Sequence, residues 1–247
     1  MPGGGVEESA THRETKQAHG VSGFNVISAH FSCCQPLNTM KVRTMPKIGV
    51  LALQGDFREH LASLERLGQR THMVRTVVDL EQVDALVIPG GESSVIDRLS
   101  RNYGLAGPIK ERIAAGMPAY GSCAGMIMLA DRIENPAISR DGAVQQSFGG
   151  IDMTVKRNAF GRQIDSFEHQ LDFNGQNLEA VFIRAPEAVQ IGPDVQVIST
   201  VQAGTDHEQG RIVAVRQGKL LATSFHPEVT GSTAIHQFFI NLTRGDA

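Results

Sequence analysis

The stretch from residue 119 to residue 129 constrains this chain most, because a short apolar strand, a turn of small residues and an apolar helix-like run follow one another without a break. Cys123 stands at the corner between Gly121 and Gly125, in the pattern G-x-C-x-G. This is the thiol counterpart of G-x-S-x-G, in which a strained strand-to-helix turn presents a nucleophile above the carboxyl end of a sheet. The glycines are needed because a side chain at either position collides with the neighbouring strand or helix.

The helix expected after the turn gives Cys123 two further properties. The positive end of its dipole stabilises a thiolate, and its free N–H groups, beginning with that of Ala124, can bind an oxyanion. The pattern therefore predicts a nucleophilic cysteine. A buried structural cysteine beside a tight turn is the alternative, since so short a motif also occurs by chance.

The composition excludes several classes of protein. With 247 residues, 41% of them hydrophobic, the chain is long enough for one domain with a substantial core. A net charge of −3 and a pI near 6.3 give no electrostatic footprint for nucleic acid, and no apolar run is long enough to span a membrane. The three cysteines, two of them adjacent at Cys33 and Cys34, cannot form a disulfide framework. We therefore expect a soluble protein of the reducing cytoplasm.

Residues 1–44 differ from the rest of the chain. They contain a glycine run and many polar residues without a period of 2 or 3.6, so we expect a disordered N-terminal extension. No apolar segment typical of a signal peptide follows the start, and Met45 directly precedes the first strand. The vicinal thiols of this segment could bind a metal ion, but we expect none. The folded domain is predicted to span residues 45–247.

From residue 47 onward, apolar strands alternate with amphipathic helices. Residues 48–53 form a run typical of a strand buried on both faces, and Phe57, Leu61 and Leu64 then recur at helical spacing until Gly68. The pattern predicts strands at 48–53, 71–74, 84–88, 117–120, 151–155, 166–173, 180–183, 195–201, 211–215 and 220–225, and helices at 57–67, from 95, at 109–115, after 123 and at 233–242. This order is typical of an α/β fold of the flavodoxin-like type, with a doubly wound, mostly parallel sheet and additional antiparallel strands in the C-terminal half.

Ligands of such a fold collect outside the carboxyl ends of the strands. Gln54, the pair Gly90-Gly91 and Cys123 all follow predicted strand ends. Two glycines let backbone N–H groups approach a ligand closely, which suits an oxyanion hole formed by Gly91 and Ala124. An ordinary Gly-Gly loop is the alternative.

A cysteine nucleophile needs a base, and the base needs an acceptor that orients it. Among nine histidines, His226 follows a strand and is followed by Pro227 and Glu228. Residues two apart in an extended chain point the same way, so Glu228 can reach the ring nitrogen of His226 that faces away from the thiol. This motif alone could be an exposed turn without a role. Its occurrence with the elbow and the glycine pair in one α/β chain favours the catalytic interpretation.

Together these segments resemble the triad-type glutamine amidotransferases, and in particular the glutaminase subunits of pyridoxal 5'-phosphate synthases. The motifs shared with many amidotransferases are PGGES at 89–93, GSCAG at 121–125 and HPE at 226–228. The more specific stretches are IGVLALQG at 48–55, RNAFGRQ at 157–163, DSF at 165–167 and FIRAP at 182–186. The resemblance extends from residue 46 to the C-terminus.

The resemblance assigns roles to individual residues. It implies that Cys123 is the nucleophile, His226 the base and Glu228 the residue that orients the base. It implies that glutamine is contacted by Gly91, Glu92, Ser93, Arg157, Ile183 and Arg184. The chemistry agrees, because a free amino acid has an α-carboxylate that suits an arginine and an α-ammonium that suits a carboxylate.

The reaction implied by the resemblance is hydrolysis of L-glutamine to L-glutamate and ammonia through a Cys123 thioester, without a cofactor or a metal. Ammonia would pass to a separate (β/α)8 synthase subunit in a hetero-oligomer, which builds pyridoxal 5'-phosphate from a pentose phosphate and a triose phosphate. The coenzyme is then a product that this chain does not bind. Gln54 is the candidate residue for activation by the partner. A cysteine hydrolase or peptidase on the same scaffold and a non-catalytic binding subunit are the alternatives.

Two features depart from the family pattern. Ser122 stands where the elbow often carries threonine, a change that keeps the hydroxyl. The polar stretch at 203–209 is longer than the usual turn there, but it contains none of the matched site residues.

Overall fold

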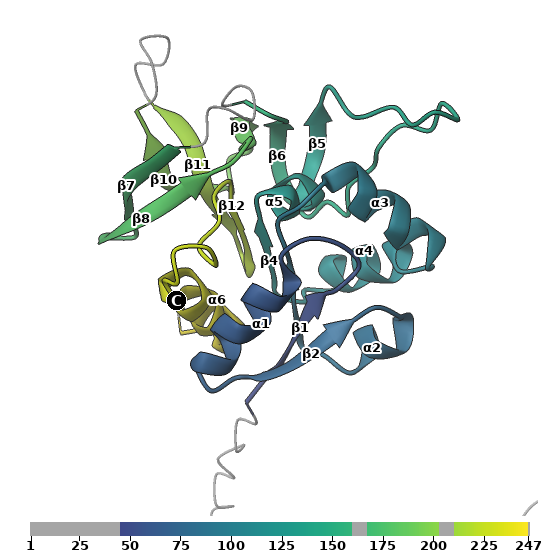
Figure 1. Ribbon diagram of the computed structural model, residues 1–247, viewed down its shortest axis with the longest axis horizontal. Coiled ribbons are helices and arrows are strands. Elements are labelled where there is room, and N and C mark those ends of the chain that lie inside the picture. Colours follow the sequence, from purple (N-terminus) through teal and green to yellow (C-terminus); the bar gives the residue numbers. More distant parts are fainter. Residues whose placement is uncertain (1–44, 160–166, 203–209, 247) are drawn as a thin grey trace, which may run out of the picture. The chain divides into compact units, whose positions relative to one another are not determined.

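The computed structural model of the protein describes residues 45–159, 167–202 and 210–246 (Figure 1). The predicted extension at 1–44 and the polar stretch at 203–209 lie outside the described residues. So do Cys33, Cys34 and part of the family-specific sequence between 157 and 167.

Strands and helices alternate in the first half of the described chain, and strands dominate the second half. The strands are β1 (Lys47–Leu51), β2 (Arg70–Val74), β3 (Ala85–Ile88), β4 (Ala119–Ser122), β5 (Ala130–Glu134), β6 (Ile151–Lys156), β7 (Phe167–Phe173), β8 (Gln176–Phe182), β9 (Glu187–Ile191), β10 (Gln196–Val201), β11 (Arg211–Gln217) and β12 (Leu220–Thr223). The helices are α1 (Phe57–Arg66), α2 (Val77–Glu81), α3 (Ser93–Asn102), α4 (Ala106–Ala114), α5 (Ala124–Leu129) and α6 (Ala234–Arg244). None of these described helices is long and apolar enough to cross a membrane.

The main sheet has a parallel part and an antiparallel part. Strands β2-β1-β3-β4-β12 run parallel in that order, and the sheet continues through β11, β9, β6 and β5. The pairs β12–β11, β11–β9 and β9–β6 are antiparallel, β10 joins β11 from outside this path, and β7 and β8 form a separate antiparallel pair. This arrangement confirms the predicted α/β fold with a mostly parallel sheet and additional antiparallel strands in the C-terminal half.

The buried strands explain why the chain has two cores. Successive side chains of a strand point to opposite faces, so in β3 Leu86 and Ile88 enter one core while Ala85 and Val87 enter the other. Helices α2, α3, α4 and α5 contribute to the first core. Helices α1 and α6, which lie side by side in Figure 1, contribute to the second with the β7–β8 pair. A strand covered on both faces reads as an uninterrupted apolar run, as the sequence indicated.

Helix α1 ends where the sequence predicted. Leu64 is fully buried on its apolar face. Gly68 has a φ of 69°, and its N–H donates to the carbonyl of Glu65 at 2.8 Å. Glycine adopts this left-handed conformation without steric cost, which closes the last turn and lets the chain enter β2.

Three short elements of the structure were not predicted, namely α2, β5 and β9. Helix α2 has five residues, too few to show a helical period, and it is fixed by a capping box between Thr76 and Asp79. Strands β5 and β9 combine buried residues with consecutive exposed ones, so no alternation marks them. Strand β4 also extends to Ser122 instead of ending at Tyr120, so that Cys123 follows it directly.

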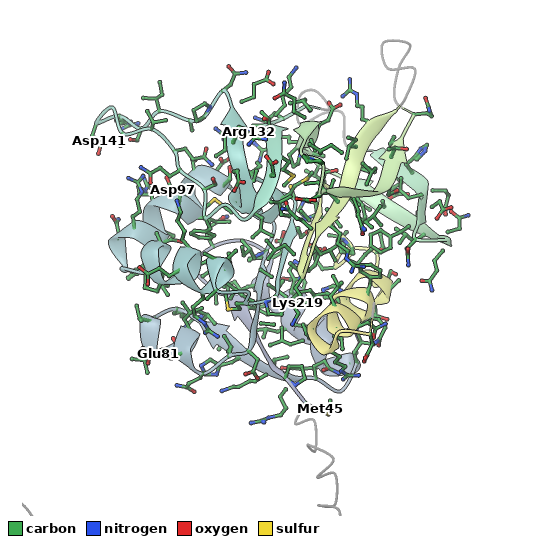
Figure 2. All side chains as sticks on the ribbon, turned by 180° about the vertical axis from the view of Figure 1, so that it is seen from behind. Met45, Glu81, Asp97, Arg132, Asp141 and Lys219 are labelled. Carbon is green, nitrogen blue, oxygen red and sulfur yellow. The ribbon has the colours of Figure 1, made fainter. Side chains whose placement is uncertain are left out.

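A projecting segment joins β5 to β6 and carries Asp141 near its tip (Figure 2). Its return path is anchored to α3, because Asp97 accepts a hydrogen bond from the N–H of Gln146 at 3.0 Å. The same carboxylate forms two contacts of 2.9 Å with Arg101 one helical turn later. Asp97 is buried, and this set of partners compensates its desolvation.

Helix α6 contributes the fully buried ring of Phe239 to the second core. We expect Phe239→Ala to lower the free energy of unfolding by about 3–5 kcal/mol, because the fully buried ring leaves a cavity under the sheet. Tyr103→Ala is the matched control, since Tyr103 is 61% exposed. It should change the free energy of unfolding by no more than about 0.5 kcal/mol. Urea unfolding monitored by circular dichroism measures both, and equal effects would contradict the assignment of Phe239 to the core.

Candidate active site

Cys123 lies at a strained corner between β4 and α5. Its φ of 49° and ψ of −100° are rare for a residue with a side chain. A Cβ atom at Gly121 would collide with the backbone of Gly125, and one at Gly125 would collide with the carbonyl of Ile88 in β3. Both glycines of the elbow are therefore required by backbone contacts, as predicted.

The loops after β1 and β3 meet at the same edge of the sheet. These strands are neighbours at the point where the strand order reverses, which is where doubly wound folds bind ligands. A Cβ atom at Gly90 would strike the ring of His226, and Gly91, with a φ of 139°, lies against the carboxamide of Gln54. Gln54 Oε1 also accepts the N–H of Glu92 at 2.9 Å. The glycine pair thus allows close packing of the histidine and the glutamine.

His226 and Glu228 form a buried pair behind the thiol. His226 Nδ1 lies 2.8 Å from Glu228 Oε1, and the backbone N–H of His226 donates to the carbonyl of Val181 at 3.0 Å. Burial lowers the pKa of His226, but its hydrogen bonds with Cys123 and Glu228 outweigh burial and raise the pKa to about 10. Burial raises the pKa of Glu228, yet the facing His60 and the bonded His226 lower it overall. The thiol of Cys123 is therefore coupled to the imidazole of His226, and the imidazole in turn to the carboxylate of Glu228.

A pocket of about 260 Å³ opens above Cys123. It is lined by Gln54, Asp56, Gly91, Glu92, Ser93, Cys123, Ala124, Ile127, Arg157, Asn158, Ile183, Arg184 and His226. Every site residue expected from the sequence lies in this lining except Glu228, which is buried behind His226.

The pocket carries a charged pair and a carbonyl close to the thiol. Arg157 and Glu92 form a contact of 2.9 Å, and Cys123 Sγ lies 4.0 Å from the carbonyl oxygen of Ile183. Arg184 is exposed at the mouth. Ala124 is the first residue of α5, so the helix itself does not use its N–H.

Backbone strain is concentrated around the pocket. Cys123, Asn158 and Arg184 line it, and they are three of the five described non-glycine residues with positive φ. Such conformations cost free energy and persist at sites where the surrounding structure enforces them. This clustering marks the pocket independently of the sequence motifs.

Several residues of the site were not assigned a role from the sequence. Asp56 lies 3.7 Å from His226 Nδ1, and its carboxylate is 46% exposed. Asp56, His226 and Glu228 are close enough to surround a metal ion, but the 2.8 Å contact between the latter two already uses one ligand atom of each. His60 and His236 lie behind Glu228. The sequence could have indicated them, because each is a histidine on the apolar face of a helix.

Fold and site together define the class of protein: an α/β protein with a thiol at a nucleophile elbow and a histidine–carboxylate pair beside it, an arrangement suited to acyl transfer. Residues 50–244 match the SNO glutamine amidotransferase family. The chain belongs to this family.

Relatives and solved structures agree with this assignment. A protein of Pseudarthrobacter chlorophenolicus named "Pyridoxal 5'-phosphate synthase subunit PdxT" is 52% identical over 220 residues, which cover 81% of this chain and 93% of that protein. A protein of the same name in Mycolicibacterium vanbaalenii is 54% identical over 197 residues, which cover 79% of this chain and 96% of that protein. A crystal structure described as a glutamine amidotransferase is 42% identical with a TM-score of 0.70, and the match covers 80% of this chain and 98% of that one. PurLQS from Thermotoga maritima, 15% identical with a TM-score of 0.56 and covering 82% and 97%, shares the fold.

The coupling between thiol and imidazole has a measurable consequence. Because the pKa of His226 is raised to about 10, its ring stays protonated at neutral pH and loses its proton as the pH rises through that value. Cys123→Ala removes interactions that raise this pKa, so the ring of the variant should titrate at a lower pH. Titration of the His226 ring by NMR in both proteins measures the shift. An identical titration in the two proteins would contradict the coupling.

Proposed function

We propose that the protein hydrolyses L-glutamine to L-glutamate and ammonia, with Cys123 as nucleophile, His226 as general base and Glu228 as the residue that orients the base. The observation that carries the proposal is the 2.8 Å contact between His226 Nδ1 and Glu228 Oε1, directly beside the Cys123 elbow. Membership of a glutamine amidotransferase family supplies the substrate class.

The first half of the proposed reaction forms a thioester. The proton of the Cys123 thiol resides on the His226 ring, and the sulfur of Cys123 attacks the side-chain amide carbon of glutamine. The carbonyl oxygen becomes an oxyanion, which the N–H groups of Gly91 and Ala124 stabilise. When the tetrahedral intermediate collapses, the C–N bond breaks and His226 returns its proton to the departing nitrogen, so that ammonia leaves.

The second half releases the product. His226 takes a proton from water while the water oxygen attacks the thioester carbon, again with the oxyanion at Gly91 and Ala124. The C–S bond then breaks, Cys123 recovers a proton, and glutamate leaves. Glu228 holds His226 Nδ1–H throughout, which keeps the other ring nitrogen available for both proton transfers.

The remaining lining residues suit a free amino acid. Arg157 and Arg184 offer guanidinium groups to the α-carboxylate, and Glu92 offers a carboxylate to the α-ammonium. Gly91, Ser93 and Ile183 complete the proposed contacts along the substrate, and all of them line the same pocket.

The names of the relatives extend the proposal to a pathway. We infer that the chain is the glutaminase subunit of a cytoplasmic pyridoxal 5'-phosphate synthase. In this role it delivers ammonia to a (β/α)8 synthase subunit within a hetero-oligomer and uses neither a cofactor nor a metal. A peptidase on the same scaffold and a non-catalytic subunit draw no support from the family assignment, and a peptidase has no need of the two arginines in the pocket.

Replacement of the nucleophile tests the central assignment. Cys123→Ala should abolish glutamine hydrolysis by the complex with the synthase, while the fold and the binding of the partner persist, because the side chain is small and lies at the edge of the sheet. Glutamate release measures the activity, and size-exclusion chromatography measures binding. A glutamine-like diazoketone should label Cys123 and neither Cys33 nor Cys34, as mass mapping of the adduct can show. More than trace activity in the variant would overturn the assignment.

Gln54 is the proposed point of control by the partner. Its carboxamide holds the N–H of Glu92 and lies against Gly91, so a change at Gln54 alters the loop that carries one oxyanion donor. A misaligned donor costs about 10²-fold or more in rate. Gln54→Ala should therefore lower partner-stimulated glutamine turnover far more than basal turnover of the isolated chain. Equal losses in both assays, or full activity without the partner, would rule out such control.

A further inference from the structure

Two buried histidines lie behind the His226–Glu228 pair and have no part in the proposed reaction. His60 on α1 and His236 on α6 are fully buried, and His60 Nδ1 lies 2.9 Å from His236 Nε2. Their helices lie next to each other in Figure 1. Polar rings in a core cost free energy unless their nitrogens have partners, so the pair calls for an explanation.

His60 links this pair to the site. Its Nε2 lies 3.5 Å from Glu228 Oε2, the carboxylate oxygen that His226 does not use. Ser122 Oγ lies 3.4 Å from the same oxygen, but its single proton has a shorter contact, 3.1 Å, with the carbonyl of Phe225. His60 Nε2 is buried and makes no well-formed hydrogen bond with any of the described residues. Glu228 Oε2, at 3.5 Å, is the carboxylate oxygen nearest to it.

The charge state of the two rings follows from their burial. Burial lowers the pKa of His60 by more than the nearby Glu228 carboxylate raises it. Burial likewise lowers the pKa of His236, to about 3. Both rings are therefore neutral at pH 7, and each carries a single N–H.

The neighbours select one tautomer of each neutral ring. With its proton on Nε2, His236 donates to His60 Nδ1, and His60 then carries its own proton on Nε2, facing Glu228 Oε2. If His60 instead carried its proton on Nδ1 and donated to His236 Nε2, the lone pair of His60 Nε2 would point toward the Glu228 carboxylate. That contact is repulsive. The two helices thus present an N–H dipole to the back of the Glu228 carboxylate.

We propose that His60, itself held by His236, is a positioning residue that fixes the Glu228 carboxylate by donating from Nε2 to Oε2. This role rests on the proposed function of Cys123, His226 and Glu228. A carboxylate held at Oε2 keeps Oε1 aligned with His226 Nδ1, and the alignment of the base depends on it.

Three variants test the role in the complete complex with the synthase. His60→Leu removes the donor, His60→Gln keeps an N–H near the position of Nε2, and His72→Leu removes a histidine of β2 that pairs with Asp79 away from the site. We expect His60→Leu to lower kcat for glutamine hydrolysis by about 10- to 100-fold with little change in KM, because the base is misaligned while the pocket is intact. His60→Gln should recover most of the loss, and His72→Leu should match the parent protein.

Two kinetic outcomes would overturn the proposal. One is a parental kcat in His60→Leu. The other is a loss in His60→Gln as large as in His60→Leu, which would indicate a packing role for the ring.

A measurement on the parent protein removes the dependence on variants that fold. Nitrogen-15 NMR of the histidine rings distinguishes the two neutral tautomers from the protonated ring, and we expect both His60 and His236 to carry their proton on Nε2. A proton on Nδ1 of His60, or a doubly protonated ring, would refute the contact. If the parent complex released no glutamate, the proposed function would fail, and the NMR result would still decide the His60 contact.

Discussion

The buried carboxylate of Glu228 is the constraint on which the rest of the site depends. A charge removed from water is tolerated only where hydrogen bonds and opposite charge compensate its desolvation. Its partner His226 comes from the same segment, while Ser122 approaches from β4 and His60 from α1. The position of one carboxylate therefore ties the end of the sheet to a helix on one of its faces, and the geometry of the thiol–imidazole pair follows from that connection.

Close backbone packing is the second condition for this geometry. The ring of His226 occupies the space where a Cβ atom at Gly90 would be, and the elbow brings Gly125 against the carbonyl of Ile88. Interiors are packed too densely for such contacts to relax by small shifts. The positions of Cys123 and His226 are consequently set by the same strand, β3, whose carboxyl end carries the Gly90 loop and supports the elbow.

Where a local pattern determines the structure, the sequence alone was sufficient to predict it. Three local patterns predicted their elements: the apolar run of β1, the helical spacing in α1 that ends at Gly68, and the small residues around Cys123. The short helix α2 and strands β5 and β9 lack such a pattern, since their formation depends on caps and on pairing with distant strands. The role of His60 was out of reach for a similar reason, because its partners come from segments far apart in the chain.

The charges in the pocket bear on the choice of substrate. Arg157 and Glu92 neutralise each other at 2.9 Å, so neither charge is left uncompensated. A free amino acid brings a carboxylate and an ammonium that can replace this internal pair by two intermolecular ones without burying a net charge. A residue within a peptide lacks both charged groups and would leave the pair unmatched or force it to stay closed. On the proposed function, discrimination in favour of free glutamine therefore resides in the α-amino acid end of the pocket as much as in the elbow that attacks the amide.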